Sequence, residues 1–87
     1  MTKPTYILIR ESSNESGYTA HPFPTETAAY TAMNCMMKSD TAAIETTYHL
    51  TPHVEQVSSY KTQLIFNAII AESDMTVKIT YSVYEVK

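Results

Sequence analysis

Apolar and polar residues alternate most regularly near the C-terminus, between Met75 and Val86. One set of alternate positions is apolar and the other is mainly polar: Val77, Ile79, Tyr81 and Val83 against Lys78, Thr80, Ser82 and Tyr84. Because successive side chains of a β-strand point to opposite faces, this pattern predicts a strand with one face on the core and one face outside. The segment is rich in β-branched and aromatic residues and lacks Gly and Pro, so propensity agrees with pattern. We expect this strand to organise the fold.

The N-terminal region predicts a β-hairpin. Within Thr5–Glu11, the alternate pair Tyr6 and Leu8 and the alternate pair Ile7 and Ile9 are both apolar. This pattern favours a central strand covered on both faces. Turn-forming residues follow from Ser12 to Gly17. Tyr18–Pro22 then resumes an extended pattern, and we expect it to pair with the first strand.

An amphipathic helix is predicted from about Glu26 to Lys38, with Thr25 as its N-cap. Apolar residues recur at helical spacing: Ala29, Ala32, Met33 and Met36, with Met37 beside them. The methionines favour core filling over a flexible binding surface. Cys35 lies among them, and we expect a buried structural thiol that forms no internal disulfide, because it is the chain's one cysteine.

The stretch from Ser39 to Ser59 fits two patterns. Asp40 is a suitable cap for a short second helix, and Thr51-Pro52 is a suitable start for helical turns through Val57. The residues from Ile44 to Leu50 also alternate as in a strand. We favour mostly helical structure in this stretch.

Tyr60–Glu72 is predicted to be a strand, although a helix continued from Pro52 is the alternative. Ser73-Asp74 is then the expected hairpin turn into the C-terminal strand. The whole chain, residues 1–87, is predicted to be one small α+β domain of order β-β-α-(α)-β-β. We expect an antiparallel sheet of about four strands, with one or two helices packed on one face.

Composition and charge narrow the function classes. The net charge is −3, with one arginine and five scattered lysines, whereas nucleic-acid binders cluster such residues to neutralise phosphates. We therefore expect no direct nucleic-acid binding. The chain has no run of eighteen apolar residues and no segment typical of a signal peptide, which favours a cytoplasmic protein without a membrane span.

Sequence motifs for catalysis or metal binding are weak. His49 and His53 are four residues apart, but Pro52 lies between them and no acidic residue or cysteine completes a ligand set with them and His21. The chain contains no Gly-x-Ser-x-Gly turn and one glycine in total. We expect no enzyme activity, no metal site and no cofactor.

Tyrosine is the abundant aromatic residue, with seven copies against two phenylalanines and no tryptophan. Tyrosine joins apolar contact area to a hydroxyl group and is enriched at interfaces. Tyr84 is expected beside Lys78, Thr80 and Ser82 on the outer face of the last strand. This face is the candidate binding or oligomer surface; the other interpretation is an ordinary exposed sheet face.

Three segments, Tyr6–Arg10, Phe23–Met33 and Tyr84–Val86, together resemble small accessory proteins of phages and mobile elements, of the anti-defence or anti-CRISPR type. The resemblance is one of fold pattern and assigns no site residue. It implies a non-enzymatic protein that inhibits a host defence complex by stoichiometric binding. The alternative is a homo-oligomeric sponge for a nucleotide-like ligand, with Arg10 and Lys78 as phosphate partners.

Overall fold

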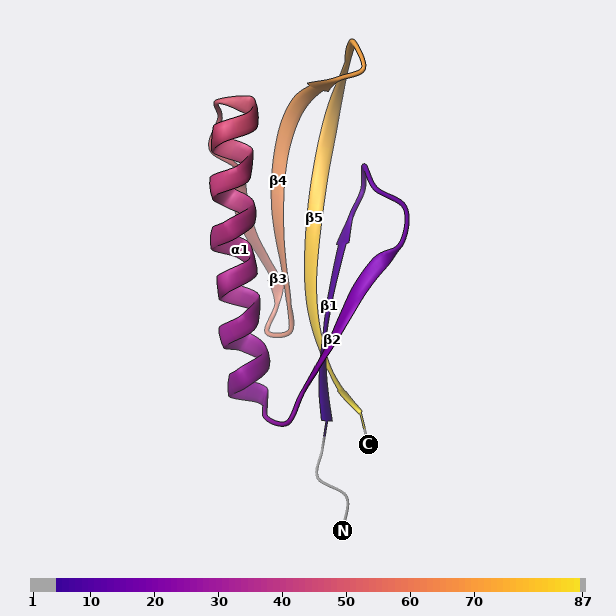
Figure 1. Ribbon diagram of the computed structural model, residues 1–87, viewed down its shortest axis with the longest axis vertical. Helices are drawn as coiled ribbons and strands as arrows, with labels where there is room; N and C mark the ends of the chain where they lie inside the picture. Colours follow the sequence, from indigo (N-terminus) through magenta and orange to yellow (C-terminus); the bar gives the residue numbers. More distant parts are fainter. Residues whose placement is uncertain (1–4, 87) are drawn as a thin grey trace.

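The computed structural model describes residues 5–86, which form one helix and five strands. The elements are β1 (Thr5–Ser12), β2 (Tyr18–Phe23), α1 (Glu26–Tyr48), β3 (His53–Ser58), β4 (Lys61–Ile70) and β5 (Ser73–Val86). The strands form one antiparallel sheet in the order β2-β1-β5-β4-β3 (Figure 1). The predicted α+β class is confirmed, with five strands where about four were expected.

β5 is the central and longest strand, with 14 residues. Its C-terminal part pairs with β1, from Ile79 opposite Ser12 to Val86 opposite Thr5. Its N-terminal part extends beyond β1 and pairs only with β4, so the β4–β5 hairpin projects from the sheet (Figure 1). The organising role predicted for the C-terminal strand is confirmed. The β1–β2 hairpin is confirmed as well, with Tyr6 opposite Phe23.

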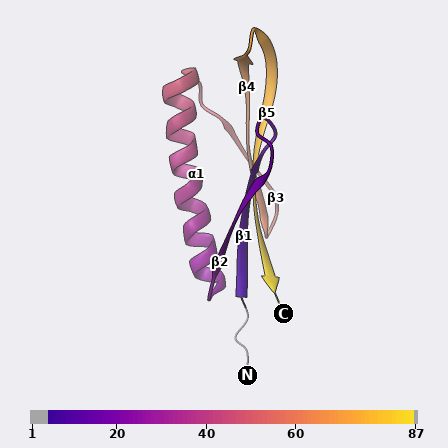
Figure 2. The ribbon, with the colours of Figure 1, turned by 45° about the vertical axis from the view of Figure 1, so that its right-hand side comes forward.

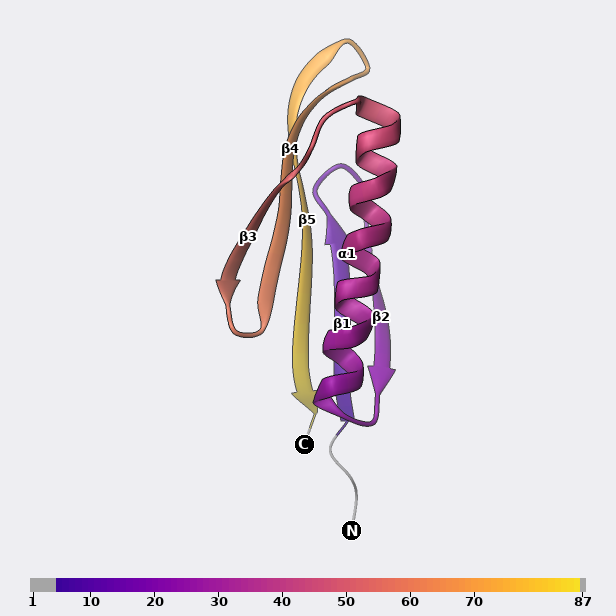
Figure 3. The same ribbon diagram turned by 90° about the vertical axis from the view of Figure 1, so that its left-hand side faces the viewer.

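α1 lies against one face of the sheet, and no element of residues 5–86 covers the other face (Figures 2 and 3). β1 therefore has one covered face, and the expectation that both of its faces are covered is wrong. The apolar side chains on its second face, Ile7 and Ile9, are half-buried by neighbouring strands.

α1 begins as the sequence predicts, because the Thr25 side chain accepts a hydrogen bond from the backbone N–H of Ala28 at 3.1 Å. The predicted end at Lys38 is wrong, since the helix continues without a break to Tyr48. Asp40 does not cap a second helix because its carboxylate binds Arg10 and Tyr81 across the layers. Ile44 is buried against the sheet, which stabilises the added turns.

Residues 53–58 form strand β3, and the prediction of helical turns there is wrong. β3 pairs with β4, with Val54 opposite Leu64. The β-branched Val54 and Val57 favour a strand once a partner strand is present, and this long-range pairing is not visible in local sequence.

The strand predicted over Tyr60–Glu72 is confirmed by β4. The turn lies earlier than predicted, at Ala71 and Glu72, while Ser73 and Asp74 already pair with β4. Both turn residues have positive φ, 52° and 66°, as a two-residue hairpin turn of type I′ requires. Ala and Glu are unusual in that conformation, which explains why turn chemistry pointed to Ser73-Asp74.

The core lies between α1 and the covered face of the sheet. Its buried apolar members are Leu8, Ala29, Met33, Ile44, Leu64, Phe66, Ala68, Val77, Ile79, Tyr81 and Val83. Met36 and Met37 pack at its border, so the methionines fill the core as predicted. Cys35 is exposed, and the prediction of a buried thiol is wrong. It is two residues, or about 200° of helix, away from Met33, which places it on the outer side of α1.

Candidate functional site

The face of the sheet opposite α1, here called the uncovered face, has no other element of residues 5–86 packed on it (Figure 2). It is formed by the side chains that alternate with the core residues along the strands. Its central members are Ile7, Ile9, Glu11, Ala20, Pro22, Lys61, Gln63, Ile65, Lys78, Thr80, Ser82 and Tyr84. Four of the five predicted site residues are therefore on one surface.

One corner of the uncovered face is apolar. Ile7 lies between Pro22 of β2 and Tyr84 of β5, and Ile9 lies between Ala20 and Ser82. Tyr84 is 53% exposed, so its ring and hydroxyl are accessible. We call Ile7, Ile9, Ala20, Pro22 and Tyr84 the apolar corner. Such a combination of aliphatic side chains and an exposed tyrosine is typical of protein interfaces.

The centre of the uncovered face is polar and has short side chains on β5. Thr80 accepts a hydrogen bond from the Gln63 amide at 3.2 Å and is opposite Glu11 on the other side. Thr80 and Ser82 are shielded by longer neighbours on adjacent strands and not by another layer. A hollow of about 270 Å³ lies beside Thr80 and Lys78. This hollow offers hydroxyl, amide and charged groups to a partner.

Arg10, the fifth predicted site residue, lies on the covered face. Its guanidinium donates two hydrogen bonds to the Asp40 carboxylate, from Nε at 2.9 Å and from the terminal nitrogen at 3.0 Å. This hydrogen bonding raises the pKa of Arg10, against the partial burial that lowers it. Arg10 therefore joins β1 to α1 and is not positioned beside Lys78 and Tyr84.

Tyr81 completes this contact between the layers. Its buried phenol donates a hydrogen bond to Asp40 Oδ2. Burial, and then the hydrogen bond to Asp40, raise the pKa of Tyr81 well above its ordinary value. Arg10, Asp40 and Tyr81 thus form a satisfied polar cluster that fixes α1 on the sheet.

A second hollow, of about 310 Å³, is lined by three tyrosines and two carboxylates. Its residues are Tyr6, Glu26, Tyr60, Val83, Tyr84 and Glu85. The two carboxylates give this hollow negative charge. An anionic ligand such as a nucleotide is therefore disfavoured there, although the tyrosines offer stacking surfaces.

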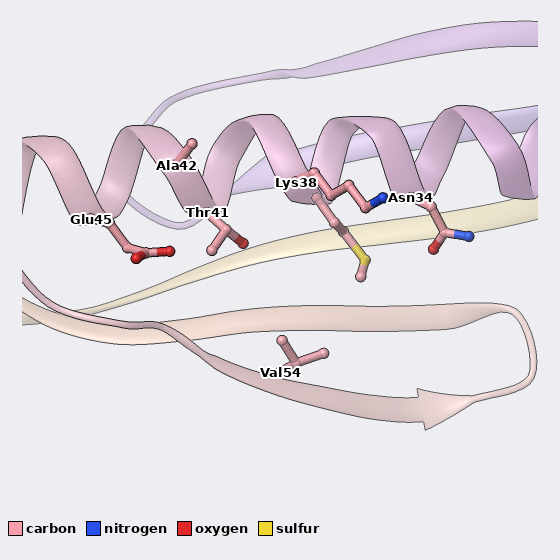
Figure 4. Close-up of a pocket in the computed structure, with 7 residues that line it drawn as sticks. Asn34, Lys38, Thr41, Ala42, Glu45 and Val54 are labelled. Carbon is pink, nitrogen blue, oxygen red and sulfur yellow. The ribbon is translucent and has the colours of Figure 1, made fainter.

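A third concavity, of about 450 Å³, separates α1 from β3. We call it the α1–β3 groove, and its lining residues are Asn34, Met37, Lys38, Thr41, Ala42, Glu45 and Val54. Figure 4 shows the helix residues on one side and Val54 on the other, with the ribbons of β4 and β5 passing between them in this view. The backbone of α1 lies close to the backbones of β1, β2, β4 and β5 but not to that of β3.

The α1–β3 groove has defined ends. At one end the Tyr30 hydroxyl donates a hydrogen bond to the carbonyl of Ser59 at 2.9 Å, which joins α1 to the β3–β4 turn. At the other end the chain passes directly from α1 to β3, through a left-handed His49 that caps the helix. Sequence reasoning missed this groove because it placed helical turns where β3 lies.

The structure does not gather metal ligands among residues 5–86, where no group of three or more His, Cys, Asp or Glu side chains is close enough to hold an ion. His49 ends α1 and His53 begins β3, so these two residues do not share a helix face. α1, the helix of the described residues, is not apolar enough along its length to cross a membrane.

Comparison with known proteins adds no family: no protein-family model, curated protein or solved structure matches the chain. Among the described surfaces, the uncovered face and the α1–β3 groove are the candidate binding sites.

Proposed function

We propose that the protein is a non-catalytic interaction module that binds a partner protein stoichiometrically through the uncovered face. The observation that carries this proposal is the one-sided packing of the sheet. α1 covers one face, while the opposite face presents the apolar corner beside the polar centre around Thr80. Apolar residues next to accessible polar groups are what a specific protein interface requires.

The size of the uncovered face supports a protein partner. Five strands spaced about 4.8 Å apart give a width of about 20 Å, and eight residues of β5 paired with β1 give a length of about 27 Å. The product is on the order of 500 Å², which is a large part of the ~800 Å² that each partner buries in a standard interface.

The charges favour a protein partner over a nucleotide-like ligand. A nucleotide sponge needs several cations directed at phosphate, but the Arg10 guanidinium is engaged by Asp40 on the other face. On the uncovered face, Lys78 and Lys61 are accompanied by Glu11 and Glu55. A surface with both signs of charge matches a mixed protein surface better than a phosphate group.

The class of partner follows from the resemblance to small phage accessory proteins: a host defence complex that this protein inhibits by occupying a surface. A plaque assay tests this part. Expression in a bacterium whose CRISPR system restricts a phage should restore plaque counts toward those of a strain without the system. Unchanged restriction across the common CRISPR types would remove the defence complex from the proposal and leave the interaction module.

Affinity capture followed by quantitative mass spectrometry tests the binding face. We compare the wild type with the uncovered-face variant Thr80→Lys/Tyr84→Ser and with the matched control Thr31→Lys/Cys35→Ser. The control makes the same Thr→Lys change and also introduces one serine, both at exposed positions of α1. We expect a protein that the wild type and the control retain in near-equimolar amount and that the uncovered-face variant loses. Equal retention by all three forms would overturn the assignment to this face.

A further inference from the structure

The outer edge of β3 is a free sheet edge. β3 is the last strand in the sheet order and pairs only with β4 among residues 5–86. Sheet edges of this kind are commonly protected by Pro, Lys or a bulge. The opposite edge strand, β2, contains Pro22, whereas β3 contains one charged side chain, Glu55, but no Pro or Lys, and its register shift comes late, between Gln56 and Ser58. The regular part, from His53 to Gln56, is open to another strand.

The α1–β3 groove lies directly beside this open part of β3. Val54 points from β3 into the groove toward α1 and is 52% exposed (Figure 4). Met37 and Ala42 provide apolar surface on the helix side. A chain added to the edge of β3 would lie beyond β3 in the sheet, and every second side chain would point to the sheet face on which the groove opens, beside Val54.

The groove also carries one charge of each sign. Lys38 and Glu45 both line it, and they lie seven residues apart on α1, which is about 10.5 Å along the helix axis. The one ion pair found among residues 5–86 is Arg10–Asp40, so neither Lys38 nor Glu45 is paired there. Because Lys38 lies nearer the start of α1 than Glu45, the groove can distinguish the two directions in which a charged segment could bind.

We propose that the α1–β3 groove and the free edge of β3 together bind an extended segment of a partner protein as a sixth strand. Backbone hydrogen bonds to β3 hold the segment, and alternate side chains enter the groove. The side chain beside Met37, Ala42 and Val54 is apolar, and the groove-side residues on either side of it are charged. This surface is separate from the uncovered face, so it goes beyond the function proposed above.

The charges predict the order of residues in that segment. β3 runs antiparallel to α1 (Figure 4), so a strand added antiparallel to β3 runs in the same direction as α1. It passes Lys38 before Glu45, and the matching order is acidic–x–apolar–x–basic. In an extended chain, the acidic and basic positions of this order are about 13 Å apart, whereas Lys38 and Glu45 are about 10.5 Å apart along the helix axis. The flexible Lys38 side chain spans this difference.

A second copy of this chain fits the groove less well. If β3 of one copy paired with β3 of another, the residues entering each groove would be Val54 and Gln56, which are uncharged. Lys38 and Glu45 would both stay without an opposite charge. Charge complementarity therefore favours a foreign segment over self-association at this edge.

Three synthetic peptides test the proposal by NMR titration of the ¹⁵N-labelled chain. The probe is Thr-Asp-Thr-Val-Thr-Lys-Thr, the second peptide exchanges its Asp and Lys, and the third replaces its Val by Ser. We expect the probe to shift amide signals of β3 and of the second half of α1. The other two peptides should bind at least about tenfold more weakly, which is about 1.4 kcal/mol.

The charge-exchange variant Lys38→Glu/Glu45→Lys is the decisive control, because both side chains are exposed and the net charge is unchanged. It should prefer the Asp/Lys-exchanged peptide by a similar factor. The variant Thr80→Lys/Tyr84→Ser should bind the probe like the wild type, which separates this site from the uncovered face. Absence of β3 shifts at millimolar probe, equal binding of all three peptides, or a dimer that Val54→Asp dissociates would each overturn the proposal.

Discussion

The two faces of β5 have the same backbone and opposite surroundings. Val77, Ile79, Tyr81 and Val83 face α1, and each is at most 6% exposed. The alternating Lys78 and Tyr84 are exposed, and Thr80 and Ser82 are shielded only by neighbours within the sheet. Because the covered face makes nearly all contacts between layers, it determines stability. The uncovered face can change in composition at little cost to the fold, which leaves it available for binding.

The largest effect on the covered face is expected from Leu64→Ala on β4. Leu64 has no exposed surface, and the lost apolar contacts and the remaining cavity should cost about 3 kcal/mol of unfolding free energy. Urea denaturation followed by circular dichroism measures this loss. Ile69→Ala on the same strand is the matched control, because Ile69 is 72% exposed and should change stability by less than about 0.5 kcal/mol. Similar losses for the two variants would contradict the assignment of the core to one face.

The next largest effect is expected from Asp40→Ala. This change leaves the Arg10 guanidinium and the buried Tyr81 hydroxyl without their partner, at a cost of about 2 kcal/mol. Both ionic side chains are about one fifth exposed, so the cost is lower than for a fully buried pair. Asp74→Ala, at an exposed position beyond the core, serves as control in the same denaturation experiment. Equal stability of Asp40→Ala and the wild type would show that this cluster does not hold α1 on the sheet.

A smaller effect is expected from Tyr81→Phe, which removes one hydrogen bond and about 1 kcal/mol at neutral pH. The folded state raises the pKa of Tyr81, so the folded protein keeps the phenol proton that the unfolded chain releases above about pH 10. The stability of the wild type should therefore fall relative to Tyr81→Phe as the pH rises above that value. Unfolding free energies measured between pH 7 and pH 11 check this. A constant difference across the range would contradict the raised pKa.

Much of the fold could be predicted because the deciding signals are local. Alternation identified β5 and β1, the Thr25 cap placed the start of α1, and Tyr84 was correctly placed beside Lys78, Thr80 and Ser82. Two of the failures involve contacts between distant residues. Asp40 resembles a cap locally, but it binds Arg10 thirty residues away. Val54 and Val57 follow a proline that suits a helix start, but pairing with β4 makes them a strand.

For the candidate sites as well, local patterns could be predicted and contacts between distant residues could not. The outer face of the last strand could be recognised from its spacing alone. Arg10 was grouped with it because a lone arginine gives no local sign of its partner on α1. The α1–β3 groove could not be predicted, because it exists only through the position of an unpredicted strand relative to an underestimated helix.

The central claim is that the covered face of the sheet determines stability and the uncovered face binds the partner. One variant tests it most directly: Thr80→Lys/Tyr84→Ser, measured for both stability and partner retention. We expect its unfolding free energy to fall by no more than about 1 kcal/mol, because Thr80 loses the hydrogen bond from Gln63 while no layer packs on these side chains. We expect partner retention to be lost while the control Thr31→Lys/Cys35→Ser retains it. Full retention, or a loss of stability as large as that of Leu64→Ala, would contradict the account.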